Sequence, residues 1–135
     1  MHNDTVTVFN RGDGVWYPTV IKNANLSMDK ANINHQYGEK SADSAILNIP
    51  YTGNKIVAGK PWKPPSEWGG PESITFRSGN DFDFFWLGEW TDGPVTDADY
   101  KGGFYQYMNK THDYVFAVSA VAWFTEIPHF EVVGK

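Results

Sequence analysis

Cysteine is absent from the 135 residues of this chain. Its absence excludes disulfide bonds, thiol nucleophiles and thiolate metal sites. The four histidines, His2, His35, His112 and His129, stand far apart and form no HxH or HExxH pattern, which leaves a metal site unsupported. The sequence also contains no nucleophile elbow, phosphate-binding loop or dinucleotide fingerprint. We therefore predict a protein that is not an enzyme, with no cofactor and no catalytic or metal-binding residues.

Basic residues are also scarce. Lys and Arg number 11 against 16 Asp and Glu, which gives a net charge of −5. This balance argues against a general nucleic-acid binder, because such proteins neutralise phosphates with clustered Lys and Arg. No run approaches the ~18 apolar residues that span a bilayer, and the first residues show no basic and apolar leader. We expect a protein that neither enters a membrane nor is exported.

Aromatic residues, by contrast, are abundant: they make up 16% of a chain that is 41% hydrophobic. The length suits a single domain over residues 1–135, which buries roughly two thirds of its unfolded surface. Two uses of the aromatic side chains remain open. They form a sugar-stacking platform, as in a carbohydrate-binding β-sandwich module, or they hold identical or neighbouring subunits together in a particle.

The segment 74–90 organises the rest of the pattern. Its sequence ITFRSGNDFDFFWLGEW predicts two strands, 74–77 and 82–87, joined by a hairpin turn at 78–81 where Gly79 and Asn80 take positive φ angles. The second strand is apolar on both faces, so we predict a central strand whose one face fills the core and whose other face meets a helix or a second chain. The two faces are Phe82, Phe84 and Trp86 on one side, and Asp83, Phe85 and Leu87 on the other.

Further strands are predicted at 5–9, 15–22, 24–33, 44–51, 114–123 and 127–133, with Pro18 indicating an edge or a bulge. One helix is predicted at about 97–109, capped by Thr96. The pair Gly102-Gly103 within it indicates either close approach of another backbone or a helix that starts only after the pair. The fold class is mainly β: a small antiparallel barrel or sandwich of about seven strands, with one late helix and a long Pro- and Trp-rich loop at 52–73.

Two charged segments are the candidate functional surfaces. The basic loop, residues 52–73, carries only Lys between positions 52 and 66, whereas the acidic segment, residues 81–100, carries six acids and no Lys or Arg. They complement each other across a repeated contact, or they are two solvated surfaces. The candidate interface residues are Lys55, Lys60, Trp62, Lys63, Pro64, Pro65, Trp68, Asp81, Asp83, Phe85, Trp86, Glu89, Asp92, Asp97 and Asp99.

Alternatives remain for both segments. The two tryptophans of the basic loop, Trp62 and Trp68, either meet a partner or tuck back over an open end of the sheet. In the acidic segment, Asp81, Asp83 and Glu89 have the chemistry of a calcium site or a glycosidase carboxylate pair. A turn followed by a strand with one outward carboxylate is the commoner explanation of that pattern.

Six segments together resemble a small structural protein from the capsid-to-tail region of long-tailed bacteriophages and prophages of Gram-positive bacteria. They follow one another in order from residue 5 to residue 135: TVTVFNR (5–11), WYPTVIKNANLSMDKA (16–31), WKPPSEW (62–68), ITFRSGNDFDFF (74–85), GFYQYMN (103–109) and IPHFEVVGK (127–135). The resemblance is to head-closure (stopper) proteins or minor capsid proteins. Head-closure proteins are small β-barrels that form rings beneath the portal, with a long loop reaching toward the DNA channel.

The resemblance implies a virion structural protein of the head-tail connector, or neck, made in the host cytoplasm. Such a protein assembles as a homo-oligomeric ring and contacts portal, adaptor or tail proteins, while DNA passes through the lumen without specific binding. Trp62, Pro64 and Trp68 then belong to the loop that meets a neighbour or the lumen, and Phe85 and Trp86 lie under the helix or at the subunit contact. A minor capsid or tail-completion protein is the alternative position.

Overall fold

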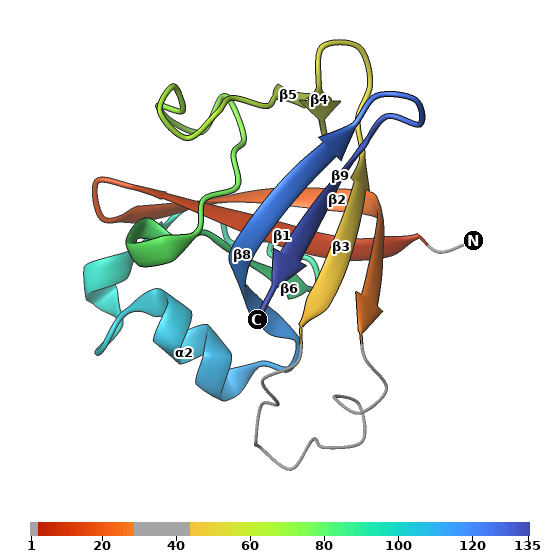
Figure 1. The fold of residues 1–135 in the computed structure, drawn as a ribbon. Helices are drawn as coiled ribbons and strands as arrows, with labels where there is room; N and C mark the ends of the chain where they lie inside the picture. The colour runs from red at the N-terminus through yellow and green to blue at the C-terminus, as the bar shows by residue number, and fades with distance from the viewer. Residues whose placement is uncertain (1–2, 29–43) are drawn as a thin grey trace.

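Six antiparallel strands close into a barrel in the computed structural model, which describes residues 3–28 and 44–135 (Figure 1). The order around the barrel is β1-β6-β8-β9-β3-β2, and β1 pairs with β2 to close it. A further short strand, β7, pairs with β2 outside the ring. The barrel strands and β7 are β1 (Asp4–Gly12), β2 (Val15–Met28), β3 (Ala45–Pro50), β6 (Phe84–Leu87), β7 (Val95–Thr96), β8 (Val115–Phe124) and β9 (His129–Gly134).

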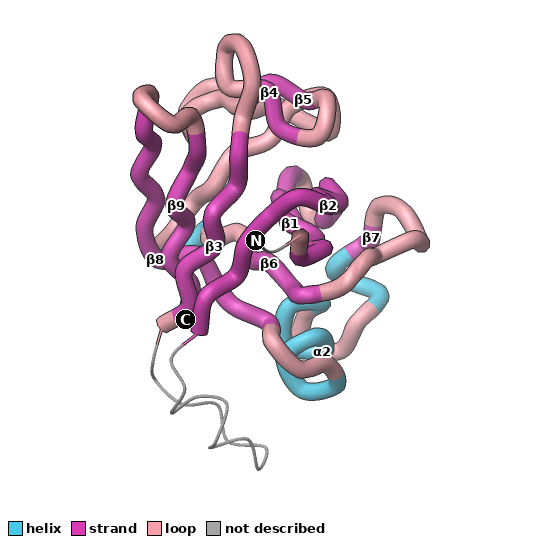
Figure 2. Tube along the Cα trace, turned by 90° about the vertical axis from the view of Figure 1, so that its right-hand side faces the viewer, coloured by secondary structure: helices cyan, strands magenta, loops and turns pink. Residues whose placement is uncertain are grey.

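The small elements lie between these strands. The long loop holds a two-residue pair, β4 (Ile56–Val57) and β5 (Lys60–Pro61), and the later chain holds two 3₁₀ turns, η1 (Gly79–Asp81) and η2 (Asp97–Asp99). The α-helix α2 (Phe104–Thr111) lies outside the barrel (Figure 2). The predicted fold class, a small mainly β barrel with one late helix, is therefore confirmed.

The first two strands form one long hairpin. Asp13 and Gly14 both have positive φ, at 51° and 77°, which is the geometry of a tight two-residue turn between Gly12 and Val15. The predicted separation of 15–22 from 24–33 is wrong as far as Met28, because β2 continues through a bulge opposite β1. The remainder of the predicted 24–33 strand lies outside the described residues.

The position of Pro18 follows from the pairing of β2. Between its contact with β7 at Val15–Trp16 and its contact with β3 from Asn25 onward, β2 pairs only with β1. Pro18 lies in this stretch, where one side of the strand has no ladder partner, so the edge position predicted from the sequence is confirmed.

Strand β6 divides two hydrophobic clusters, as its two apolar faces predicted. Phe85 faces the barrel interior and Phe84 faces outward beneath α2, with β1 and β8 as its neighbours in the sheet. The inner core consists of Val6, Val8, Ile21, Ala24, Ala45, Leu47, Ile49, Tyr51, Val57, Ile74, Phe76, Phe85, Phe116, Val118, Phe130 and Val132. The outer cluster consists of Phe9, Trp16, Phe84, Val95, Phe104, Met108 and Val115.

The predicted hairpin before β6 is wrong. Residues 75–78 form no ladder, and Ile74 makes only an isolated parallel bridge to Trp62. Only Arg77 and Asp83 are joined across the turn: the backbone N–H of Asp83 donates to Arg77 O at 2.9 Å, and the carboxylate of Asp83 accepts the backbone N–H of Arg77 at 2.9 Å. The turn is the 3₁₀ turn η1, in which Gly79 has a positive φ and Asn80 does not.

The helix is shorter than predicted and starts later. Gly102 and Gly103 have φ angles of 83° and 102°, so the backbone leaves helical geometry at the pair, and α2 begins at Phe104. Thr96 makes no side-chain capping bond, and the predicted start at residue 97 is the separate 3₁₀ turn η2. The later start was the alternative that the glycine pair had left open.

Candidate interaction surfaces

A buried ion pair lies beneath the β1–β2 turn. Asp83 is fully buried, and its oxygens accept Arg77 Nε at 3.0 Å and Arg77 Nη2 at 2.7 Å. The backbone N–H of Arg11 donates to the same carboxylate at 3.3 Å. Burial raises the pKa of Asp83, and the guanidinium and the two backbone donors oppose that rise. The Asp83 carboxylate thus binds Arg77 on one side and the β1 backbone at Arg11 on the other, and so holds residues 74–83 against β1.

The three carboxylates that suggested a calcium or glycosidase site have separate partners. Asp81 is exposed in η1, Asp83 pairs with Arg77, and Glu89 lies 3.8 Å from Lys22 in an exposed ion pair. Within residues 3–28 and 44–135 no group of three or more His, Asp or Glu side chains is placed to hold a metal ion. These three carboxylates therefore do not converge on one site, and the prediction of a strand with one outward carboxylate is wrong for Asp83, which is buried against Arg77.

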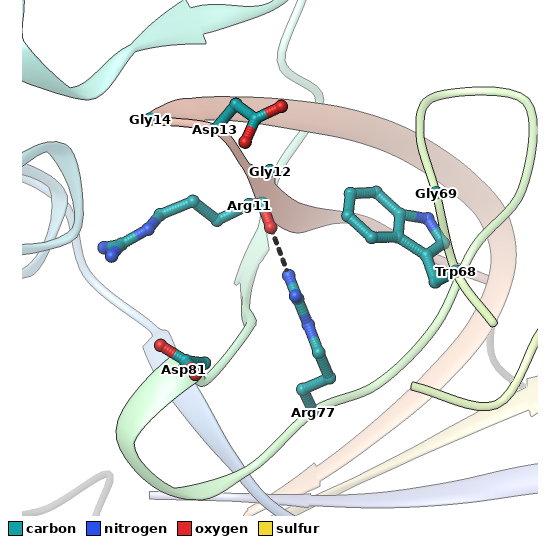
Figure 3. A pocket seen from close by; sticks show the side chains of 8 residues that line it. All are labelled: Arg11, Gly12, Asp13, Gly14, Trp68, Gly69, Arg77 and Asp81. Atoms are coloured by element: carbon teal, nitrogen blue, oxygen red, sulfur yellow. Dashed lines mark hydrogen bonds between the residues drawn. The ribbon is translucent and has the colours of Figure 1, made fainter. Parts of the chain in front are cut away.

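An open cleft of about 480 Å³ lies above this ion pair (Figure 3). It is lined by Arg11, Gly12, Asp13, Gly14, Trp68, Gly69, Arg77 and Asp81. The guanidinium of Arg77 lies 4.8 Å from the centre of the Trp68 ring, and a Cβ on Gly12 would lie only 3.1 Å from that ring. The lining presents the carboxylates of Asp13 and Asp81, the guanidinium groups of Arg11 and Arg77, and the indole of Trp68.

The basic loop folds back over the barrel. Trp62 packs against Trp123 and Phe130, with ring centres 5.4 and 5.5 Å away, and Trp68 donates its indole N–H to Ser73 O at 2.9 Å. Of its lysines, Lys60 donates to Thr19 Oγ1 on β2, and burial lowers the pKa of Lys60 while Glu72 opposes that change. Both tryptophans thus fold back onto the barrel, and Trp68 also lines the open cleft.

The remaining residues of the basic loop differ in exposure. Lys63 and Pro65 are exposed, Pro64 is half-buried, and Pro64 O accepts the N–H groups of Glu67 and Trp68 in a turn. Lys55 is half-buried, with its Nζ 5.9 Å from the Trp62 ring centre and 5.7 Å from that of Trp123. Of the predicted basic surface, Lys55 and Lys63 are therefore the side chains left to meet a partner.

The acidic segment divides into internal and exposed carboxylates. Asp97 accepts the Trp16 indole N–H and the Phe104 backbone N–H, both at 2.8 Å. Burial raises its pKa, but these two donors and the nearby charge of Arg11 outweigh burial and hold the pKa of Asp97 below its ordinary value. The exposed acids of the segment are Asp81, Glu89, Asp92 and Asp99.

Two of the predicted interface residues are inside the protein. Phe85 is 0% exposed and packs in the inner core, so its assignment to the space under the helix or to a subunit contact is wrong. Asp83 is equally buried and cannot be reached by a partner. Trp86, on the opposite face of β6, does lie on the helix side, where its ring centre is 5.1 Å from that of His112.

The sequence analysis missed one surface, the tip of the β8–β9 hairpin. Trp123, Phe124 and Ile127 are 48%, 43% and 77% exposed there, and Trp123 is the one exposed tryptophan of the six. The sequence AWFTEIP (122–128) could have indicated this surface, because its two adjacent aromatic residues fall on opposite faces of a strand that is about to end. Most of the other aromatic side chains fill the two clusters, which leaves few for a sugar-stacking platform.

The chain matches a family of unknown function, DUF6751, over residues 1–135. It belongs to the DUF6751 family. No curated protein and no solved structure matches this DUF6751 chain. Its described part contains no helix that is long and apolar enough to cross a membrane.

Proposed function

We propose that the protein is a non-enzymatic virion component of the head-tail connector of a long-tailed bacteriophage, of the head-closure type. In this role it assembles as a ring and contacts portal, adaptor or tail proteins. The observation that carries the proposal is a closed barrel on which three exposed large apolar side chains, Trp123, Phe124 and Ile127, lie together at the tip of one projecting hairpin. The resemblance of six consecutive segments to phage neck proteins supports the same role.

A closed barrel suits repeated assembly for a physical reason. The ring of strands leaves few free backbone groups, so neighbouring copies do not add edge to edge in arbitrary registers. Contacts must then be made by side chains on projecting loops. Exposed apolar side chains on such a projection favour contact with another protein, because the removal of apolar surface from water is favourable.

The charge of the protein agrees with a DNA conduit. A net charge of −5 repels the phosphate backbone, so DNA passes without being held. The exposed acids of the acidic segment, Asp81, Glu89, Asp92 and Asp99, contribute to this repulsion.

Particle composition tests the proposal directly. Mass spectrometry of purified virions, from a phage or induced prophage encoding this chain, should find it in the particle at a fixed copy number. Negative-stain electron microscopy and light scattering of the purified protein should find rings, alone or with portal protein added. A strict monomer absent from virions overturns the proposal, and retention of that monomer on insoluble polysaccharide favours a carbohydrate-binding module. Presence in virions at hundreds of copies on the capsid shell favours a minor capsid protein.

A further inference from the structure

The tip of the β8–β9 hairpin projects from one side of the molecule. Residues 122–128 are all exposed, and Ile127 has the largest exposed fraction of any large hydrophobic side chain in the described chain, at 77%. Beside it are one acid, Glu126, and one base, Lys55, whose Nζ lies 5.7 Å from the Trp123 ring centre. The tip is a small apolar projection with one charge of each sign.

Several contacts hold this tip in one conformation. The hydroxyl of Tyr51 donates to Phe124 O at 2.7 Å, and His129 Nδ1 donates to Ile127 O at 2.6 Å. The rings of Phe124 and His129 stack with their centres 4.8 Å apart. A tip that is already ordered loses little conformational entropy when it binds, so its apolar side chains contribute more of their burial to affinity.

The cleft lies on the opposite side of the barrel. Figure 1 shows the β1–β2 turn, which forms one wall of the cleft, at the left, and the β8–β9 tip at the upper right. The cleft offers the counterparts of the tip: the Trp68 ring for an apolar side chain, Arg11 for an acid, and Asp81 for a base. In Figure 3 the Arg11 side chain points away from Arg77, which is itself committed to Asp83.

The charged groups of both surfaces have only weak partners within the chain: Arg11 lies 5.5 Å from the Trp16 ring centre and near Asp97, and Lys55 lies near the Trp62 and Trp123 rings. Neither Glu126 nor Arg11 is in an ion pair with another described residue, and the same holds for Lys55 and Asp81. Two surfaces on opposite sides of one chain, each carrying what the other lacks, make a heterologous contact that repeats from copy to copy.

We propose that the β8–β9 tip of one copy docks in the cleft of the next, with Ile127 against Trp68 and Glu126 against Arg11. Lys55 of the first copy meets Asp81 of the second. This inference rests on the multimeric assembly of the proposed function and names the contact that produces it. The proposed contact also pairs Lys55 of the basic loop with Asp81 of the acidic segment. The hairpin that docks, β8–β9, belongs to neither segment.

Charge reversal tests the direction of the contact. The variants Arg11→Glu and Glu126→Arg should each raise the concentration of half-assembly about tenfold or more, measured by sedimentation velocity. Mixed in equal amounts, the two variants should assemble again. Each reversed cleft then meets a reversed tip, and each natural cleft meets a natural tip. Contacts made elsewhere on the barrel do not predict this rescue.

The apolar part of the contact has a matched control. Ile127→Asp should abolish assembly, while Ile46→Asp, on the exposed face of β3 away from both surfaces, should assemble as the wild type does. Circular dichroism verifies that each variant folds, and a variant that does not fold is replaced by Glu126→Gln or Ile127→Ser.

The outcomes separate the inference from the proposed function. Wild-type rings that persist in Ile127→Asp, or single variants that fail to rescue each other, overturn the docking contact and leave the virion role standing. A wild-type chain that stays monomeric at every accessible concentration also overturns the contact. Its presence or absence in virions decides the proposed function separately.

Discussion

The two hydrophobic clusters on the two faces of β6 are built differently. The inner core mixes aliphatic and aromatic side chains from all six barrel strands and from residues 74–76. The outer cluster is mostly aromatic, and its partly buried neighbours, Phe82, Trp86, Trp90, Tyr100 and Tyr105, are all aromatic. Phe9 and Phe84 stack there with ring centres 4.7 Å apart, and Trp16 meets Phe84 edge-on at 4.9 Å.

The difference follows from what each cluster has to hold. Strands on all sides of the inner core already fix its walls, so alternating residues of moderate size fill it. The outer cluster holds an eight-residue helix, α2, which is too short to be stable alone. Large rings supply the most buried area per residue, and each favourable ring pair adds about 0.5–1.5 kcal/mol. Many of the aromatic residues in the sequence therefore serve to hold this short helix on the barrel.

Truncating a ring in the inner core should have the largest effect. Phe85→Ala truncates a fully buried side chain of the inner core. The barrel strands that surround it cannot move together to fill the cavity that this truncation leaves. We expect the free energy of unfolding to fall by about 3–5 kcal/mol, measured by urea denaturation. Phe85→Leu, which keeps most of the volume, should lose much less. A loss below about 1 kcal/mol for the alanine variant would contradict a rigid inner core.

The same truncation in the outer cluster should have a smaller and more local effect. Phe104→Ala removes the ring by which α2 meets Phe9 and Trp90, at 5.3 Å from each. Because the helix can detach while the barrel stays closed, we expect a loss of about 2–3 kcal/mol, at or below the lower end for buried phenylalanine. Amide hydrogen exchange should quicken in 104–111 and stay slow in β1 and β8. Equal quickening of exchange in the barrel strands would show that the two clusters unfold as one unit. The control is Tyr107→Ala, on the exposed side of α2.

Asp97 links Trp16 to the start of α2, and its removal should lower the free energy of unfolding by less than the two phenylalanine truncations do. Asp97→Ala leaves the Trp16 indole N–H and the first N–H of α2 without their acceptor. We expect a loss of about 1–2 kcal/mol at neutral pH, measured by denaturant unfolding. Asp99→Ala, on the exposed side of the same 3₁₀ turn, should change stability little.

The effect of Asp97 should also depend on pH in a defined direction. Its pKa is lowered in the folded protein, so the folded state favours the charged carboxylate. The stability it contributes is complete above the unfolded pKa of ~3.9 and is lost as pH falls through the lower folded pKa. The difference in stability between wild type and Asp97→Ala should therefore narrow as pH falls below the unfolded pKa of ~3.9. A constant difference between pH 7 and pH 3 would assign the effect to packing.

Local alternation was enough to predict much of this fold. The buried series Ala45, Leu47, Ile49 and Tyr51 and the two faces of β6 were readable because each strand has a core on at least one side. The hairpin at 74–87 was not predictable in this way, because Ile74 and Phe76 alternate equally well in an extended segment that forms no ladder and makes only one bridge, from Ile74 to Trp62. The segment is held by bonds to residues far away in the chain, among them Asn10 Nδ2 to Thr75 O at 2.7 Å and Arg11 N–H to the Asp83 carboxylate at 3.3 Å.

The sequence predicted where the charged surfaces lie in the chain, but it did not predict which of their side chains are exposed. Composition marked the basic loop and the acidic segment, but whether Trp62 or Trp123 faces solvent depends on how the loop returns over the barrel end. Phe85 and Trp86 are neighbours in sequence, and one residue of register sends the first inside and the second outside. The cleft combines residues from the β1–β2 turn, the basic loop and η1, which no local pattern joins.

Ile127 belongs to neither cluster, and its truncation should have the smallest effect on the isolated fold. Ile127→Ser removes a side chain that is 77% exposed and leaves no cavity, so we expect the free energy of unfolding to change by no more than about 0.5 kcal/mol. Val132→Ser, on the next strand but fully buried in the inner core, should lose several times more. If Ile127→Ser keeps the melting temperature of the wild type and loses self-association, the isoleucine acts only between molecules. A large loss of stability in the monomer would instead place the tip among the elements that hold the barrel end closed.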